Sequence, residues 1–151
     1  MNHKKSLANA CIMSKLTYGI SLWGLSCKKT VLNRVQVTQN LVAAWVTGLP
    51  RWTQTKDLLN KVDWLSIYQL TIYHSLLLLW KIQDKREPVR NLKLLEGREL
   101  ARIELTQRTL AIRARAIFLA LDPSVRDVRN VSIFKNNIKK WIKQNIPIEG
   151  E

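Results

Sequence analysis

The sequence predicts an all-α protein, a compact bundle of about six helices joined by short turns. Three observations support this fold class. Apolar residues recur at helical spacing along most of the 151 residues. Gly and Pro, which interrupt helices, number only five and four. Ser, Thr or Asp precedes several of the apolar stretches, where its side chain can cap the first turn of a helix.

Two helices are expected in the first 50 residues. The first runs from about Leu7 to Leu22, and Gly24 supplies its stop. Thr30 is the expected N-cap of the second helix. Gly48 suits the left-handed residue that ends this helix, and Pro50 prevents its continuation.

The next two helices should include the centre of the core. Thr55 is expected to cap a short helix over Lys56–Lys61. Ser66 is expected to cap a longer helix from Ile67 to about Lys85. The middle of that helix, Leu76–Trp80, is apolar on nearly every side, as in a helix surrounded by others. We therefore expect it to be the most buried.

The rest of the chain is expected to hold a connection at residues 89–106 and then shorter helices. Helix is expected over Gln107–Leu121, and Asp122-Pro123 suits the N-cap and first residue of a short helical turn. Ser132 is the expected cap of the last helix. Spacing places its apolar residues on one side and its lysines on the other: Phe134, Ile138, Trp141 and Ile142 against Lys135, Lys139, Lys140 and Lys143.

The charge balance favours a polyanionic partner. The chain has 25 Lys and Arg against 11 Asp and Glu, a net charge of +14. Cations of this kind bind phosphates and release counterions, so such binding weakens with salt. A basic surface that only aids solubility explains the composition as well. The longest apolar run is far too short to cross a bilayer and the N-terminus is a poor signal peptide, so we expect no membrane partner and an intracellular location, cytoplasmic or nuclear.

The sequence offers little for catalysis, and we expect neither an enzyme nor a cofactor. Its acids are scattered singly, without the paired carboxylates that hold the metal ions of a polymerase. His3, His74, Cys11 and Cys27 do not show the short spacings of zinc ligands, so we expect no metal site and reduced thiols. His74 is expected to be a core or boundary residue rather than a general base.

Three blocks of the sequence occur in the order found in one known family. The central block contains Gln36, Gln39-Asn40, Val46-Thr47-Gly48-Leu49-Pro50-Arg51, Thr53, Thr55 and Trp64-Leu65-Ser66. The upstream block contains Ser14-Lys15-Leu16, Tyr18-Gly19 and Trp23-Gly24. The downstream block contains Arg115-Ala116, Pro123, Val125-Arg126, Ser132-Ile133-Phe134-Lys135 and Ile138-Lys139-Lys140-Trp141-Ile142. Together they resemble the region that follows the polymerase palm in non-LTR (LINE-type) retrotransposon reverse transcriptases, over most of the chain.

The resemblance implies a thumb-like helical unit at residues 1–88, the connection at 89–106, and a basic helical segment at 107–151 that packs on the first unit. In that family this region grips the RNA template or the RNA:DNA duplex beside the palm, and the palm itself is missing here. The chain departs from the family at Leu41 and Ala44, where basic residues are usual, and at Leu119-Ala120-Leu121-Asp122, which stands where the family has Trp-Asn-x-Leu. Contacts made by the basic residues are therefore not carried over.

From charge, position and resemblance we predict a set of nucleic-acid contacts. Phosphate contacts are expected at Arg51, Arg113, Arg115, Arg126, Arg129, Lys135, Lys139, Lys140 and Lys143. Trp52 is the one candidate for base stacking, although packing against the helices is the commoner use of such a residue. Solvated helix surfaces are an equally ordinary use of the lysines.

Two other partners are compatible with the sequence. The chain could be a protein-interaction module that binds a partner or a second copy through the apolar face at Leu41, Ala44 and Trp45. It could instead supply a thumb in trans to a polymerase chain that bears the palm. Exposure of Trp45 beside Leu41 would favour a protein partner, because contiguous exposed apolar side chains mark interaction sites.

Overall fold

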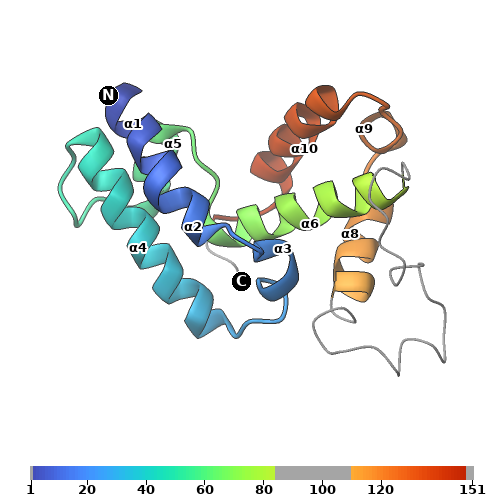
Figure 1. Cartoon of the computed structure of the whole chain (residues 1–151), viewed down its shortest axis with the longest axis horizontal. Helices are drawn as coiled ribbons and strands as arrows, with labels where there is room; N and C mark the ends of the chain where they lie inside the picture. Colours follow the sequence, from blue (N-terminus) through green and yellow to red (C-terminus); the bar gives the residue numbers. More distant parts are fainter. Residues whose placement is uncertain (1, 84–109, 149–151) are drawn as a thin grey trace.

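The computed structural model describes residues 2–83 and 110–148, and these residues form helices and turns without a strand (Figure 1). The all-α fold class predicted from the sequence is thereby confirmed. The expected connection at residues 89–106 lies outside the described residues.

The N-terminal helix expected at Leu7–Leu22 is interrupted. It consists of α1 (Asn2–Ala8), a π-helical turn η1 (Asn9–Met13), α2 (Ser14–Leu16) and α3 (Ile20–Trp23). The prediction of one continuous helix was wrong because Gly19 adopts a left-handed conformation, with φ of 63°, that breaks the helical path before α3. The stop at Gly24 is confirmed, since α3 ends at the preceding residue.

The second helix, α4 (Lys29–Thr47), ends as predicted but begins earlier. Gly48 has φ of 72° and donates its N–H to the carbonyl of Ala44, which closes the last turn. The predicted cap at Thr30 is wrong. Lys28 is already extended and its carbonyl accepts the first helical hydrogen bonds, so Thr30 lies inside the first turn.

The third helix, α5 (Thr55–Val62), also begins one residue before its predicted start. Gln54 is its N-cap, and Thr55 is its first residue. The predicted cap at Thr55 is therefore wrong, since Thr55 lies inside the first turn. Its hydroxyl accepts a hydrogen bond of 2.7 Å from the Asn40 side chain. The helix ends at Val62, and Asp63 follows it in a left-handed conformation with φ of 56°.

The cap expected at Ser66 is confirmed. Helix α6 (Ile67–Gln83) begins with a reciprocal pair of hydrogen bonds, in which the Ser66 N–H donates to Gln69 Oε1 (3.1 Å) and the Gln69 N–H donates to Ser66 Oγ (3.2 Å). This capping box satisfies two N–H groups that the first turn leaves without helical partners.

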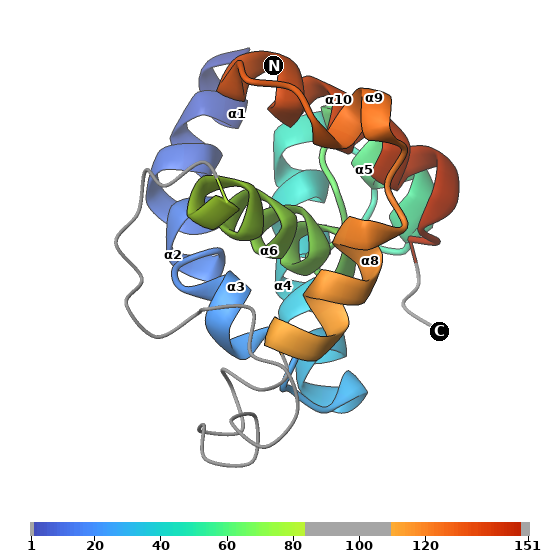
Figure 2. The same ribbon diagram turned by 90° about the vertical axis from the view of Figure 1, so that its right-hand side faces the viewer.

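Helix α6 runs through the middle of the structure, with α1–α3 on one side and α8 on the other (Figure 2). The C-terminal elements are η3 (Leu110–Ala114), α8 (Arg115–Leu119), α9 (Pro123–Arg126) and α10 (Val131–Asn145). Trp80 of α6 stacks on Phe134 of α10 with ring centroids 5.1 Å apart, and its Nε1 donates to the carbonyl of Val128. Leu76 and Phe134 are fully buried, so α6 is the central core helix that its apolar sequence predicted.

The last helix is capped by Asn130 and not by Ser132. The Asn130 side chain accepts hydrogen bonds from the backbone N–H groups of Ser132 (2.8 Å) and Ile133 (3.4 Å). Ser132 was the wrong residue because α10 begins at Val131, which places Ser132 in its first turn. Asp122 does take the N-cap position before Pro123 of α9, as expected, without a side-chain hydrogen bond.

A second apolar cluster joins α1, α4 and α5. It contains Ala8, Val42, Ala43, Ala44, Val46, Leu58 and Val62. One side of α4 is thereby committed to packing, and the opposite side is open to solvent.

Candidate nucleic-acid interface

The net positive charge of the chain lies on the described residues. Residues 2–83 and 110–148 contain 18 of the 25 Lys and Arg but only 4 of the 11 Asp and Glu, so they hold the whole excess of +14. Residues 2–56, which form α1 to α4, the turn after them and the first two residues of α5, contain 8 Lys and Arg and no acid. Helices α1 to α4 therefore contribute cations and no carboxylate of their own, and the first acid in the sequence is Asp57 of α5 (Thr55–Val62).

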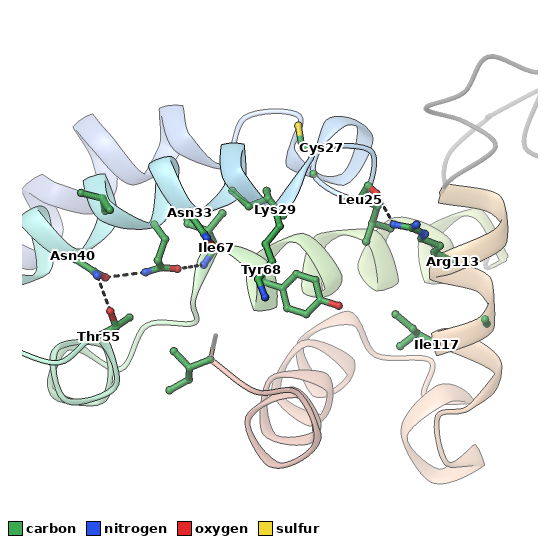
Figure 3. Close-up of a pocket in the computed structure, with 16 residues that line it drawn as sticks. Leu25, Cys27, Lys29, Asn33, Asn40, Thr55, Ile67, Tyr68, Arg113 and Ile117 are labelled. Atoms are coloured by element: carbon green, nitrogen blue, oxygen red, sulfur yellow. Dashed lines mark hydrogen bonds between the residues drawn. The ribbon is translucent and has the colours of Figure 1, made fainter. Parts of the chain in front are cut away.

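An open groove of about 780 Å³ lies between α4 and the α8 region (Figure 3). Lys29 and Arg113 supply its cations, and none of the described residues that line it is acidic. Figure 3 shows Lys29 of α4 directed towards Tyr68 of α6 across the groove. The lining combines these two cations with side-chain amides and with apolar residues such as Leu32 and Val37.

The α4 wall of the groove is held by side-chain amides. Gln36 Nε2 donates to Gln39 Oε1 (2.9 Å) and Asn40 Oδ1 (2.8 Å), and Gln36 Oε1 accepts the Ile67 N–H at 2.8 Å. Gln39, which is fully buried, donates to the carbonyl of Leu65 at 2.8 Å. This amide network fixes α4 against the start of α6, because buried polar groups must be paired to avoid a desolvation cost.

Arg113 closes one end of the groove. Its Nη1 donates to the carbonyl of Leu25 at 3.2 Å, so the side chain joins η3 to the turn after α3. The sequence predicted Arg113 as a phosphate contact, and the structure gives it a tethering bond with further guanidinium donors beside it. The groove residues Lys29 and Asn33 were not predicted, because nothing in the sequence shows that α8 lies opposite α4.

Two of the four predicted lysines on α10 are engaged within the protein. Lys139 Nζ lies 2.7 Å from Asp63 Oδ2, and Lys143 also pairs with the Asp63 carboxylate. These two hydrogen-bonded lysines lower the pKa of Asp63 from 3.8 to about 2. The attractive charge of this helix face therefore comes mainly from Lys135 and Lys140, which are exposed.

The other predicted contacts come from separate segments. Trp52 is 87% exposed in the turn after α4, where Arg51 is exposed as well. Arg126 pairs with Asp127 at 3.1 Å. Arg129 is exposed, and Arg115 is partly buried on α8. Exposure makes Trp52 accessible for stacking, whereas the ion pair of Arg126 offsets its charge.

An apolar face of α4 is exposed. Leu41 and Trp45, one turn apart, are 47% and 46% exposed, and Val37, one turn earlier, is 59% exposed. Lys4 Nζ lies 5.6 Å from the Trp45 ring centroid. Ala44 was expected on the same face, but it is 4% exposed and packs in the second cluster.

Neither a candidate metal site nor a membrane-spanning helix is present among the described residues. No group of three His, Cys, Asp or Glu side chains in residues 2–83 and 110–148 could hold a metal ion. Burial lowers the pKa of His74, and the nearby charge of Lys135 lowers it further. None of the described helices has the length and apolar character that crossing a membrane requires.

Comparisons with protein-family models, with curated proteins and with solved structures find no match. The resemblance to reverse transcriptases therefore stays a prediction that rests on the order of its motif blocks. The structure adds the distribution of charge and of exposed apolar side chains.

Proposed function

We propose that the protein is a non-catalytic helical module, similar to a reverse transcriptase thumb, that binds the backbone of RNA or of an RNA:DNA duplex through its basic helix faces. One observation carries the proposal, namely that the whole net charge of +14 lies on the described helices and turns. Phosphate contacts by Lys and Arg are independent of base sequence, so the binding is directed by charge and shape. That the protein binds a polymerase chain bearing the palm stays a prediction, which rests on the resemblance alone.

Two surfaces are candidates for the contact. One is the groove side of α4, where Lys28 and Lys29 begin a helix in a segment without acids. The other is α10, where Lys135 and Lys140 are exposed and Asp63 offsets their neighbours. We expect the first to contribute more, because residues 2–56 contain no acid, whereas Asp63 pairs with two of the lysines on α10.

The experiment is a binding titration across a salt series with labelled RNA:DNA hybrid, double-stranded RNA, single-stranded RNA and DNA. Lys28→Glu/Lys29→Glu is compared with Lys135→Glu/Lys140→Glu, which makes the same change in net charge on another helix. Glu is tolerated at positions 28 and 29 because acids at a helix N-terminus interact favourably with its dipole. Lys139 and Lys143 are left unchanged, so that the Asp63 ion pairs survive.

We expect affinity to fall steeply with salt, with the logarithmic slope reduced by about 0.9 for each phosphate contact removed. The Lys28/Lys29 variant should lose more affinity than the Lys135/Lys140 variant. Equal losses would mean that only the overall charge matters. Weak binding that neither salt nor either variant alters would refute the proposal.

A second candidate function is a protein-interaction module, favoured by the exposure of Leu41 and Trp45. Polar replacement of Leu41 separates the two functions, since it changes no charge and should leave nucleic-acid binding intact.

A further inference from the structure

Three apolar side chains form a stripe on the solvent side of α4. Val37, Leu41 and Trp45 follow one another at intervals of four residues, which places them in adjacent turns on one face. All three are between 46% and 59% exposed. We call these three residues the α4 stripe, and its eight-residue span corresponds to about 12 Å along the helix axis.

The α4 stripe has a cation near each end. Arg34 lies seven residues before Leu41, which places both on the same helix face. Lys4 of α1 lies over the Trp45 ring with its Nζ 5.6 Å from the centroid. No acid occurs anywhere in residues 2–56, so α1 and α4, which carry these cations, supply no carboxylate of their own.

We propose that the α4 stripe docks an acidic amphipathic helix of a partner protein. Apolar side chains of that helix, spaced three or four residues apart, would contact Val37, Leu41 and Trp45. Its Asp and Glu residues beside them would pair with Arg34 and Lys4. This inference rests on the second candidate function, and it names the chemistry of the partner.

Charge argues against a second copy of this chain as the occupant. In a two-fold symmetric dimer the same patch meets itself, so Arg34 and Lys4 of one copy would approach the same residues of the other. Like charges brought together in an interface cost free energy, and residues 2–56 supply no acid to offset them. An acidic partner reverses the sign of this interaction.

The side chains argue against a nucleic-acid backbone as the occupant of the stripe. Val37 and Leu41 have no donor for a phosphate oxygen. Lys4 already lies over the ring of Trp45, which leaves less of that ring for base stacking. Aliphatic side chains are instead what another amphipathic helix buries.

The test uses a synthetic helical peptide with Leu residues on one face and Glu residues beside them. A control peptide has the same composition, with its Leu residues distributed around the helix. Calorimetric titration of the full chain should show binding of the first peptide that weakens with salt. Leu41→Gln should reduce the affinity at least about tenfold, as expected for a central interface residue.

A matched variant controls for the loss of exposed apolar surface. Ile133 on α10 is 51% exposed, so Ile133→Gln makes the same chemical change away from the stripe and should leave peptide binding unchanged. Val37→Gln, at the most exposed position of the stripe, should also weaken peptide binding. Because Val37 lines the groove as well, RNA binding by this variant is not used to separate the two surfaces.

Several outcomes would overturn the proposal. They are equal binding of the control peptide, equal effects of Leu41→Gln and Ile133→Gln, and self-association in sedimentation that Leu41→Gln abolishes. Binding to phosphatidylserine vesicles that depends on Leu41, without peptide binding, would identify a lipid surface instead. RNA binding is measured on the same variants. Loss of RNA binding in Leu41→Gln would place the stripe in the nucleic-acid surface, whereas failure of peptide binding alone leaves the nucleic-acid proposal intact.

Discussion

Replacing Gly24 by Ala tests how closely α3 packs on α6. A Cβ atom at this position would lie 2.5 Å from Thr71 Cγ2 and 2.6 Å from the carbonyl oxygen of Ile20. Carbon atoms normally make contact at about 3.5–4.0 Å, so Thr71 or the chain around Gly24 must retreat by about 1 Å. Thr71 is fully buried and its hydroxyl donates to the carbonyl of Ile67 at 2.9 Å, which restricts its movement. We expect Gly24→Ala to lower the free energy of unfolding by about 1–3 kcal/mol.

The assay is urea denaturation of the full chain, with a double-mutant cycle to identify the clash. The added Cβ would also lie 2.6 Å from Thr71 Oγ1. Thr71→Ala removes both Oγ1 and Cγ2, so Gly24→Ala should cost less in the Thr71→Ala background, by at least about 0.5 kcal/mol. Gly48→Ala is the control, since a Cβ there meets nothing within 4 Å and only its left-handed φ of 72° is unfavourable. Its cost should be the same in both backgrounds. If Gly24→Ala cost the same free energy of unfolding in both Thr71 backgrounds, the proposed close approach of Gly24 to Thr71 would be refuted.

Two further predictions concern polar contacts. The pKa of Asp63 falls from 3.8 to about 2 on folding, so its charge stabilises the protein above about pH 4, and this stabilisation is lost as pH falls through 2. Its side chain is 58% exposed, so we expect Asp63→Asn to cost only about 1 kcal/mol or less at pH 6 in urea denaturation, with the difference shrinking towards pH 2. A difference independent of pH would contradict a role for this charge. Gln39→Ala should cost about 2–4 kcal/mol, because it leaves a cavity and the buried carbonyl of Leu65 without its donor. Unchanged stability would show that the amide network does not hold α4 to α6.

Signals confined to a few residues predicted the fold well. Gly48 and Pro50 mark the end of α4, and Ser66 with Gln69 forms the cap of α6, because each acts on the turn next to it. Predictions of helix caps failed where a neighbouring residue occupies the N-cap position. The side chain of Asn130, not that of Ser132, accepts the first N–H groups of α10. The local sequence does not show which of two neighbouring capping residues takes the N-cap position.

The candidate site was less predictable, because its properties depend on contacts distant in sequence. The lysine pattern of α10 suggested a phosphate-binding face, but Lys139 and Lys143 meet Asp63, which lies 76 and 80 residues earlier in the chain. The left-handed turn at Asp63 ends α5 and brings this carboxylate to α10. Nothing in the spacing of the lysines reveals such a partner.

The residues that suggested a family and those that could perform a function are largely different in this structure. Gln36, Gln39 and Asn40, in the most informative block, bond to backbone and side-chain groups within the protein and hold α4 in place. Residues of this kind indicate a shared fold, and proteins with the same fold can have different functions. Function depends on the side chains that the fold exposes, which are cations such as Lys29 and apolar residues such as Leu41. Since the two kinds lie on the same helix, charge reversal at Lys28 and Lys29 and polar replacement at Leu41 can decide between nucleic-acid and protein binding without disturbing the amide network.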